Sequence, residues 1–375
     1  MTYMARALGL AERSLGWCSP NPAVGAVIVR DGEIVGEGWT QPPGQAHAEI
    51  IALRAAGPRA NGATLYVTLE PCSHHGRTPP CTEAIISAGI RSVHAAMVDP
   101  SPWVNGGGLA ALRDAGIATS VGEHEEDARR LNEAYLTWVR TRVPFVTLKY
   151  AVTVDGKIAT RTGSSFWVTG VEARRYVARL RSRVDAVLVG VGTVLADDPQ
   201  LTARPGEFGD VENQPVHQPT RVVFDSSARV DLSSRVVSGS LPGTTILCTT
   251  DRAPESKLRD LRAFGVETIV VPSRDARVDV CAALRELGQR NITSVLAECG
   301  GSLAWSLLQA GAVHKICAFF APKIVGGAGA PSPVEGRGVE TMDAAWTLTD
   351  TRWTPLGSDM LLEGYVSSCD RTTTS

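Results

Sequence analysis

Residues 47–81 read HAEIIALRAAGPRANGATLYVTLEPCSHHGRTPPC, and their alternating pattern indicates the architecture of the first half of the chain. Residues 47–56 have the apolar spacing of a helix, and residues 63–69 are rich in the residue types that favour strands. A further helix is predicted over 82–88, directly after the second cysteine. Histidine, glutamate and cysteine therefore stand at the ends of alternating elements.

The flanking sequence continues this alternation. Residues 2–16 have helical spacing, and residues 24–39 (VGAVIVRDGEIVGEGW) are two apolar runs joined by an Asp-Gly pair, which is a strong hairpin signal. A strand over 93–98 and a helix over 109–115 follow. Strands that alternate with helices after an opening hairpin predict a layered α/β domain.

A domain boundary is predicted at Pro144, giving domains 1–143 and 144–375. There a charged helical stretch gives way to the β-rich run FVTLKYAVTVDGKIAT. In the second half we expect helices starting near Val171, Val278 and Ser302, and strands at 186–191, 221–225, 244–250, 266–271, 294–299 and 315–325. The Gly/Pro-rich segment 204–220 is expected to be a surface loop, and residues 367–375 are expected to be disordered.

Composition narrows the class of protein. The 375 residues are 43% apolar and 20% charged, with a formal net charge of -2, so no general basic surface for nucleic acid is indicated. Eight cysteines are few for a disulfide framework in a chain of this length, and no apolar run is long enough for a signal peptide or membrane span. We expect a reduced, cytoplasmic protein that binds neither nucleic acid nor membrane; homo-oligomerisation stays open.

His47, Cys72 and Cys81 form the sharpest chemical pattern. One imidazole and two thiolates suit Zn²⁺, and three protein ligands leave the fourth tetrahedral position open, as in catalytic zinc sites. His74 and His75 lie in the insert SHHGRTPP between the cysteines and compete as ligands. Cys81 ranks above them because thiolates suit zinc and because it follows a proline pair into a helix.

Glu49 stands two residues after His47, at the start of the same predicted helix. It is placed to transfer protons rather than to bind the metal, because zinc deaminases combine His-x-Glu with a following Pro-Cys and use the glutamate as general acid and base. Zinc in such a site lowers the pKa of water and supplies hydroxide. The alternative is a plain helix start with two buried cysteines, which the combined pattern disfavours.

The second half carries weaker signals. Gly190-Val191-Gly192 begins like a dinucleotide fingerprint, but the third glycine is missing, so this is not a Rossmann match. Gly300-Gly301 lies between a predicted strand and a predicted helix, where bare backbone amides suit cofactor phosphates. A plain tight turn is the alternative.

Several segments resemble the bifunctional riboflavin-biosynthesis deaminase/reductases. In the first half these are SPNPAVGAVIVRDGEIVGEG (19–38) and LEPCSHHGRTPPC (69–81), and in the second half they include VGVGTVLADDPQLTAR (189–204) and AECGGSLAWSLL (297–308). The resemblance covers nearly the whole chain in the same domain order. It implies a cytidine-deaminase-like three-layer domain followed by a dihydrofolate-reductase-like domain, whose sheet is twisted, mostly parallel and flanked by helices.

The same resemblance implies the remaining site residues. In the first half Asn21 would hold the pyrimidine and Arg77 would meet the ribose phosphate, whereas Thr40 departs from the histidine expected in many relatives. NADPH contacts are implied for Ala151, Trp167, Thr193, Asp197, Ser226, Gly300, Gly301, Ser302 and Leu303. Substrate contacts are implied for Ser165, Arg181, Leu201, Arg204 and Glu298.

Chemistry supports part of this assignment. Arg181 and Arg204 suit a bidentate grip on a phosphate, and Trp167 offers a flat face beside a cofactor ring. The alternatives are a core position for Trp167 and an ordinary exposed arginine for Arg181.

The sequence thus predicts two reactions on a small phosphorylated pyrimidine. The first domain, with one zinc, hydrolyses an exocyclic amine of a diaminopyrimidinone ribosylamino phosphate, and the second uses NADPH to reduce the ribosyl group to ribityl. One rival hypothesis is a nucleic-acid deaminase with a C-terminal binding module. Another is a chain in which only one domain is active.

Overall fold

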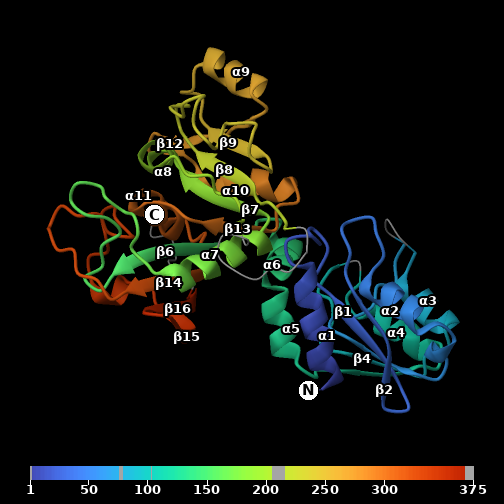
Figure 1. Cartoon of the computed structure of the whole chain (residues 1–375). Coiled ribbons are helices and arrows are strands. Elements are labelled where there is room, and N and C mark those ends of the chain that lie inside the picture. Colours follow the sequence, from blue (N-terminus) through green and yellow to red (C-terminus); the bar gives the residue numbers. More distant parts are fainter. Residues whose placement is uncertain (1, 76–78, 103, 205–215, 368–375) are drawn as a thin grey trace. The chain divides into compact units, whose positions relative to one another are not determined.

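The structure is a computed structural model that describes residues 2–75, 79–102, 104–204 and 216–367. The chain divides into two compact units, Met1–Val143 and Pro144–Ser375 (Figure 1). Most of the predicted loop 204–220 and of the predicted disordered end lies outside the described residues. No helix in the described ranges has both the length and the apolar character needed to cross a membrane.

The first unit is built on a five-stranded sheet in the order β2-β1-β3-β4-β5. β1 is antiparallel to β2 and β3, whereas β3, β4 and β5 are parallel. Its elements are α1 (Tyr3–Ala11), a 3₁₀ turn (Glu12–Ser14), β1 (Gly25–Arg30), β2 (Glu33–Trp39), α2 (Ala48–Ala56), a 3₁₀ turn (Gly57–Ala60), β3 (Thr64–Val67), α3 (Cys81–Ser87), β4 (Ser92–Ala95), α4 (Gly107–Asp114), β5 (Ala118–Val121), α5 (Glu125–Leu131) and α6 (Glu133–Thr141).

Glycines in the β1–β2 hairpin let helices approach both faces of this sheet. A Cβ at Gly25 would collide with the backbone of α1, and a Cβ at Gly38 would collide with the backbone of Ala48 and Ala52 in α2. Figure 1 shows α1 and α5 on one side of the sheet and α2, α3 and α4 on the other. The predicted three-layer α/β architecture is therefore confirmed.

The second unit is built on a nine-stranded sheet in the order β10-β9-β8-β7-β13-β6-β14-β16-β15. Its elements are β6 (Phe145–Thr153), α7 (Val171–Arg183), β7 (Ala186–Gly190), α8 (Val191–Asp197), β8 (Thr220–Phe224), β9 (Thr245–Thr249), α9 (Glu255–Ala263), β10 (Glu267–Val270), β11 (Ser273–Arg274), β12 (Arg277–Val278), α10 (Val280–Gln289), β13 (Ser294–Ala297), α11 (Gly301–Gln309), β14 (Lys315–Ala321), a 3₁₀ turn (Met342–Ala344), β15 (Leu348–Leu356) and β16 (Asp359–Val366).

This sheet is parallel from β10 to β14, and β16 and β15 extend it antiparallel. Side chains of α7, α8 and α9 pack with β7 and β8 in one apolar cluster, so these helices cover one face. Right-handed crossovers place α10 and α11 on the other face. The central parallel strands are buried, which explains the continuous apolar runs in their sequences. The mostly parallel sheet flanked by helices confirms the predicted fold class.

One predicted helix begins later than expected, and several elements were not predicted. The helix expected near Val278 begins at Val280, because the Asp279 side chain caps it by accepting the Ala282 N–H at 2.8 Å, and residues 273–278 form the short β11–β12 hairpin instead. Neither β5, α8 and α9 nor the terminal β15–β16 hairpin was predicted from the sequence. That hairpin was missed because most of β15 is exposed and lacks a buried apolar alternation.

Replacing Gly38 with alanine should destabilise the first unit. The added Cβ meets main-chain atoms of α2, which cannot rotate away, so we expect a loss of about 1–3 kcal/mol in the free energy of unfolding. Gly9→Ala is the matched control, because Gly9 is exposed within α1 and has open space around it; alanine there should stabilise the unit by about 0.5–1 kcal/mol. Urea unfolding of both variants measures the difference, and equal effects would contradict the packing argument.

Candidate active sites

His47, Cys72 and Cys81 converge in the first unit from three different elements. His47 is the residue that precedes α2, Cys72 lies in the loop after β3, and Cys81 is the first residue of α3. The His47 Nδ1 atom lies 3.3 Å from the Cys81 sulfur and 3.7 Å from the Cys72 sulfur. The Cys81 backbone N–H donates to the Cys72 sulfur at 3.3 Å, so the start of α3 also fixes the position of Cys72.

The chemistry of these donors fits a zinc ion. One ligand atom from each residue lies within 4.8 Å of the others, and among the described residues these three form the one such group of histidine, cysteine and acidic side chains. A hydrogen bond between the two sulfurs lowers the pKa of Cys72 and raises that of Cys81, so the pair shares one proton, which a bound metal ion would displace. His75 instead pairs with Glu83 at 3.3 Å, and its side chain is 72% exposed.

Glu49 lies in the first turn of α2 and lines a cavity of about 330 Å³ together with His47 and Cys72. Its side chain is almost fully buried. Burial, followed by the negative charge of Cys72, raises the pKa of Glu49 to about 7. A carboxyl group with a pKa near neutrality both accepts and returns a proton readily, as general acid–base catalysis requires.

Among the described residues of the first unit, the other predicted site residues line the same cavity. Asn21, Thr40 and His74 all line it. The Thr40 hydroxyl is engaged with the backbone of Val24, from whose N–H it accepts at 3.1 Å. Arg77 lies outside the described residues.

Four further side chains that line the cavity were not predicted from the sequence: Asp99, Tyr135, Trp138 and Arg142. The Tyr135 hydroxyl donates to both carboxylate oxygens of Asp99 at 3.0 and 3.1 Å. Burial raises the pKa of Asp99. An aspartate soon after a predicted parallel strand was the available signal, because carboxyl ends of parallel strands carry functional side chains.

Cys81→Ser should remove the metal from the first unit. The hydroxyl is a poor zinc ligand at neutral pH, and the remaining two ligands hold zinc weakly. Metal analysis of the purified chain should give about one zinc for the wild type and close to none for the variant. Cys281→Ser is the control, because Cys281 lies in α10 and approaches only a backbone carbonyl. Unchanged zinc in Cys81→Ser would make the ligand set wrong and turn attention to His74.

In the second unit, the N-termini of α8 and α11 lie side by side at the carboxyl ends of the paired strands β7 and β13. A Cβ added to Gly190 would lie 3.5 Å from the Leu303 side chain. A Cβ added to Gly300 would lie 4.0 Å from the Thr193 hydroxyl. A Cβ on Gly301 would overlap the Glu335 side chain and the Ser332 backbone. Gly192 and Gly300, by contrast, have nearly open space where a Cβ would stand, and bare backbone at these two helix starts suits the pyrophosphate of a dinucleotide cofactor.

Other residues predicted for this site lie at the same edge of the sheet. Ser165 donates to Asp197 at 3.4 Å, which joins a predicted substrate contact to a predicted cofactor contact. The Ser226 hydroxyl accepts the Val278 N–H at 3.0 Å. Ser302 donates to Glu335 at 3.1 Å, and Ala151 lies half-buried in β6.

Trp167 and Leu201 differ in exposure. Trp167 is 56% exposed, with the Arg174 guanidinium 4.8 Å from the centre of its ring, so the alternative of a core tryptophan is excluded. Leu201 is buried in the apolar cluster beneath α7, α8 and α9, so any substrate contact would come from its backbone.

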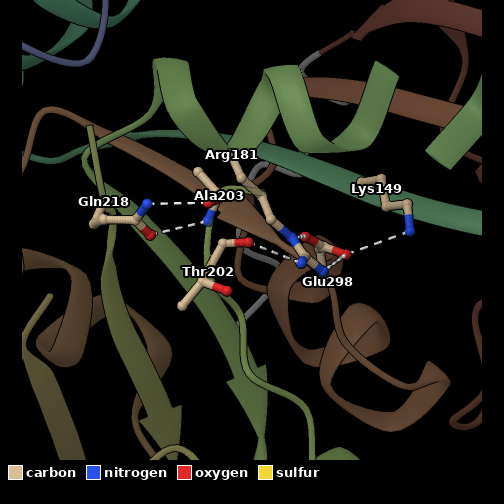
Figure 2. A network of polar contacts seen from close by, with 6 residues as sticks. All are labelled: Lys149, Arg181, Thr202, Ala203, Gln218 and Glu298. Carbon is tan, nitrogen blue, oxygen red and sulfur yellow. Dashed lines mark hydrogen bonds and ion pairs between the residues drawn. The ribbon is translucent and has the colours of Figure 1, made fainter. Parts of the chain in front are cut away.

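Figure 2 shows a buried ionic network at the end of β13. Arg181 donates to both oxygens of Glu298, from Nε at 2.6 Å and from Nη2 at 3.0 Å, and Lys149 donates to Glu298 at 3.3 Å. Burial alone would raise the pKa of Glu298, but the two cations outweigh it and hold the pKa at about 2. The alternative of an ordinary exposed Arg181 is thereby excluded, since its side chain is only 14% exposed.

Arg181 and Gln218 also hold the backbone of the segment that precedes Arg204. Arg181 reaches the Thr202 carbonyl at 3.3 Å, and the Gln218 amide makes two hydrogen bonds to the backbone of Ala203, at 3.0 and 3.1 Å (Figure 2). Because Glu298 fills the bidentate edge of Arg181, that edge cannot grip a phosphate in this arrangement. Arg204 itself is half-buried, two residues after Thr202.

Lys149 was missed by the sequence analysis. A lysine as the one charged residue of the β-rich run FVTLKYAVT was the available signal. A buried charge requires a partner of opposite charge. The sequence of a strand shows that a charged residue is there, but it does not show which residue is its partner.

Arg181→Met should destabilise the second unit strongly at neutral pH. Removing one partner leaves Glu298 buried without its main counter-ion, which typically costs about 3–5 kcal/mol. Because the pKa of Glu298 is depressed to about 2, its stabilising contribution is present above the unfolded value near 4.5 and is lost as pH falls through 2. Urea unfolding at several pH values should therefore show a gap between wild type and variant at pH 7 that shrinks below pH 4.5.

The control for this experiment is Arg175→Met on the same helix. Arg175 pairs with Glu172 at 2.7 Å, but both side chains are at least 40% exposed, so the change should cost no more than about 1 kcal/mol. Equal losses in the two variants would contradict a special role for the buried network.

A histidine and two cysteines beside a buried glutamate, on a three-layer α/β sheet, place the first unit among the zinc deaminases, and the second unit has the architecture of a nucleotide-dependent reductase. Residues 1–97 match the family model described as "Cytidine and deoxycytidylate deaminase zinc-binding region". Residues 144–362 match the model described as "RibD C-terminal domain". The chain therefore belongs to the RibD family of riboflavin biosynthesis proteins, which are bifunctional deaminase/reductases.

Relatives resemble the chain over almost its whole length. Riboflavin biosynthesis protein RibD of Synechocystis sp. is 45% identical and covers 98% of this chain and 97% of its own. Form 2 of Acinetobacter baumannii RibD superposes with a TM-score of 0.84 at 36% identity, covering 97% of this chain and 98% of its own.

A Thermotoga maritima protein described as a diaminohydroxyphosphoribosylaminopyrimidine deaminase/5-amino-6-(5-phosphoribosylamino)uracil reductase superposes with a TM-score of 0.82 at 36% identity, with the same coverage. Both enzyme activities and the two cofactors, zinc and NADPH, follow from these matches together with the His/Cys/Cys cluster.

Proposed function

We propose that this chain carries out two consecutive steps on one phosphorylated pyrimidine in the cytoplasm. The first unit deaminates a diaminopyrimidinone that carries a ribosylamino phosphate, and the second unit reduces its ribosyl group to ribityl with NADPH. The observation that carries the proposal is the convergence of His47, Cys72 and Cys81 beside the buried Glu49, in a chain that matches bifunctional relatives from end to end.

For the deamination we propose His47, Cys72 and Cys81 as zinc ligands and Glu49 as the proton carrier. Zinc bound there supplies a water molecule with a lowered pKa, which is the nucleophile of the reaction. Glu49 takes the proton that this water loses and returns it to the amino group, which leaves as ammonia while the oxygen stays on the ring. Its burial in the first turn of α2, in the same cavity as His47 and Cys72, supports this double role.

The rest of the cavity orients the pyrimidine. Asn21 and His74 present polar side chains to the same space as Glu49, and the Asp99 carboxylate is held by Tyr135. We propose that these groups hold the ring so that its amine faces Glu49. Thr40 contributes little to recognition, because its hydroxyl already bonds to the backbone of Val24.

For the reduction we propose that NADPH lies along the carboxyl edge of β7, β8 and β13. Its contacts would be Ala151, Trp167, Thr193, Asp197, Ser226, Gly300, Gly301, Ser302 and Leu303. NADPH held there would supply the hydride that, together with a proton from water, reduces C1 of the ring-opened ribosyl group. Backbone amides at the starts of α8 and α11 would bind the pyrophosphate, and the exposed face of Trp167 would lie against a cofactor ring.

The substrate contacts of the second unit need one refinement. Ser165, Arg181, Leu201, Arg204 and Glu298 remain the proposed set. Since Arg181 is bound to Glu298, we assign the phosphate contact primarily to Arg204 and propose that Arg181 and Lys149 fix the Glu298 carboxylate toward the sugar.

Glu49→Gln should abolish deamination and spare reduction. The amide keeps the size of the side chain but cannot accept and return a proton, so ammonia release should fall at least about 10²–10⁴-fold. Zinc content should stay near one per chain, because the ligands are unchanged. NADPH oxidation on already deaminated substrate should stay close to the wild-type rate.

Arg204→Ala is the mirror variant. It should release ammonia normally and accumulate the deaminated, unreduced intermediate, because Arg204 belongs to the second unit.

Near-normal ammonia release by Glu49→Gln would refute the assignment of Glu49. If both activities fell together in either variant with zinc retained, the two units would be coupled rather than independent.

A further inference from the structure

We propose that Arg142 binds the phosphate group of the substrate at the rim of the deaminase cavity, and that Trp138 holds the guanidinium in place. The proposal rests on the proposed function, since it takes the substrate to be a phosphorylated pyrimidine. It assigns the orientation in which this substrate enters the first unit: pyrimidine inward, phosphate outward.

The position of Arg142 follows from the end of α6. Arg142 caps this helix, and its backbone N–H donates to the Trp138 carbonyl at 2.8 Å. Both side chains line the same cavity of about 330 Å³ as Glu49. Trp138 is buried at 8% exposure, whereas Arg142 is exposed, so the guanidinium lies where the cavity meets solvent.

Arg142 differs in charge from the carboxyl groups that line the cavity. Arg142 is the one arginine or lysine among the residues that line the described cavity, whereas Glu49, Glu70 and Asp99 all contribute carboxyl groups. The Glu70 carboxylate is already satisfied by three backbone N–H groups at 3.0–3.2 Å. A phosphate deep in the cavity would face these carboxyl groups, so the rim beside Arg142 is the favourable place for it.

The contact with Trp138 leaves the guanidinium ready for an anion. The Arg142 guanidinium carbon lies 4.4 Å from the centre of the Trp138 ring. Such a cation–π contact uses the flat face of an arginine and leaves its N–H edges directed sideways, where a phosphate binds in bidentate fashion. Within the described part of the chain, no carboxylate forms an ion pair with Arg142.

The backbone at this position allows a clean test. Arg142 has φ +58°, in the left-handed region that glycine adopts readily and other residues disfavour. Arg142→Gly therefore removes the side chain and relieves an unfavourable backbone conformation at the same time. A loss of substrate binding in this variant cannot be explained by a loss of folding.

The experiment uses the zinc-loaded full chain and measures ammonia release on the phosphorylated pyrimidine for wild type, Arg142→Gly, Arg142→Lys and the control Arg140→Ala. Arg140 is an exposed arginine on α6 that does not line the cavity. Loss of a charged hydrogen bond corresponds to a KM about 10- to 100-fold higher for Arg142→Gly, with kcat within about twofold of wild type. Arg142→Lys should recover part of the loss, and Arg140→Ala should show none.

Two further readouts test the role of the phosphate itself. The dephosphorylated substrate should have the same KM with wild type and Arg142→Gly, and inorganic phosphate should inhibit the wild type competitively but not the variant. Thermal unfolding should show Arg142→Gly to be at least as stable as wild type. An unchanged KM for the phosphorylated substrate would overturn the inference, as would an equal loss on both substrates. Absence of ammonia release by the wild type would instead overturn the proposed function.

Discussion

Parallel pairing of β-strands is the constraint on which both sites depend, because strands that run in one direction end at one edge of their sheet. In the first unit, the loops after β3 and β4 bring Cys72 and Asp99 to the same cavity. In the second unit, β7, β8 and β13 end beside one another, which gathers Ser226, Glu298 and the two helix starts. Residues that are remote in sequence meet there without any single segment that carries a complete site.

The two sites use this edge for opposite electrostatic purposes. Near Glu49 the surroundings favour a neutral carboxyl group, because burial and a thiolate oppose its charge. Near Glu298 two cations force the carboxyl group to stay ionised although its side chain is only 9% exposed. One glutamate is thereby made ready to exchange a proton and the other is fixed as a permanent acceptor, and the difference comes from neighbours contributed by other strands and helices.

These neighbours mark the limit of sequence reasoning. The alternation of strands and helices predicted the α/β class, and His47, Glu49, Cys72 and Cys81 were recognisable because residue type and short spacing express their chemistry. The bond between Arg181 and Glu298 spans 117 residues, and nothing in either segment names the other. Arg142 resembles an ordinary charged end of an amphipathic helix until the fold places it beside a cavity. The sequence therefore indicated which residues are candidates for the chemistry, and the structure was needed to show which side chains surround them.

Burial determines how the Arg181–Glu298 ion pair responds to dissolved salt. Dissolved salt weakens attraction between exposed charges over a Debye length of about 8–10 Å, but ions do not enter a dry contact. Side chains that are 14% and 9% exposed keep their attraction at any ordinary ionic strength, whereas exposed pairs such as Arg129 with Glu125 lose much of theirs. The geometry of the second site is thus insulated from salt, while the first site meets its anion at a solvated rim where salt competes directly.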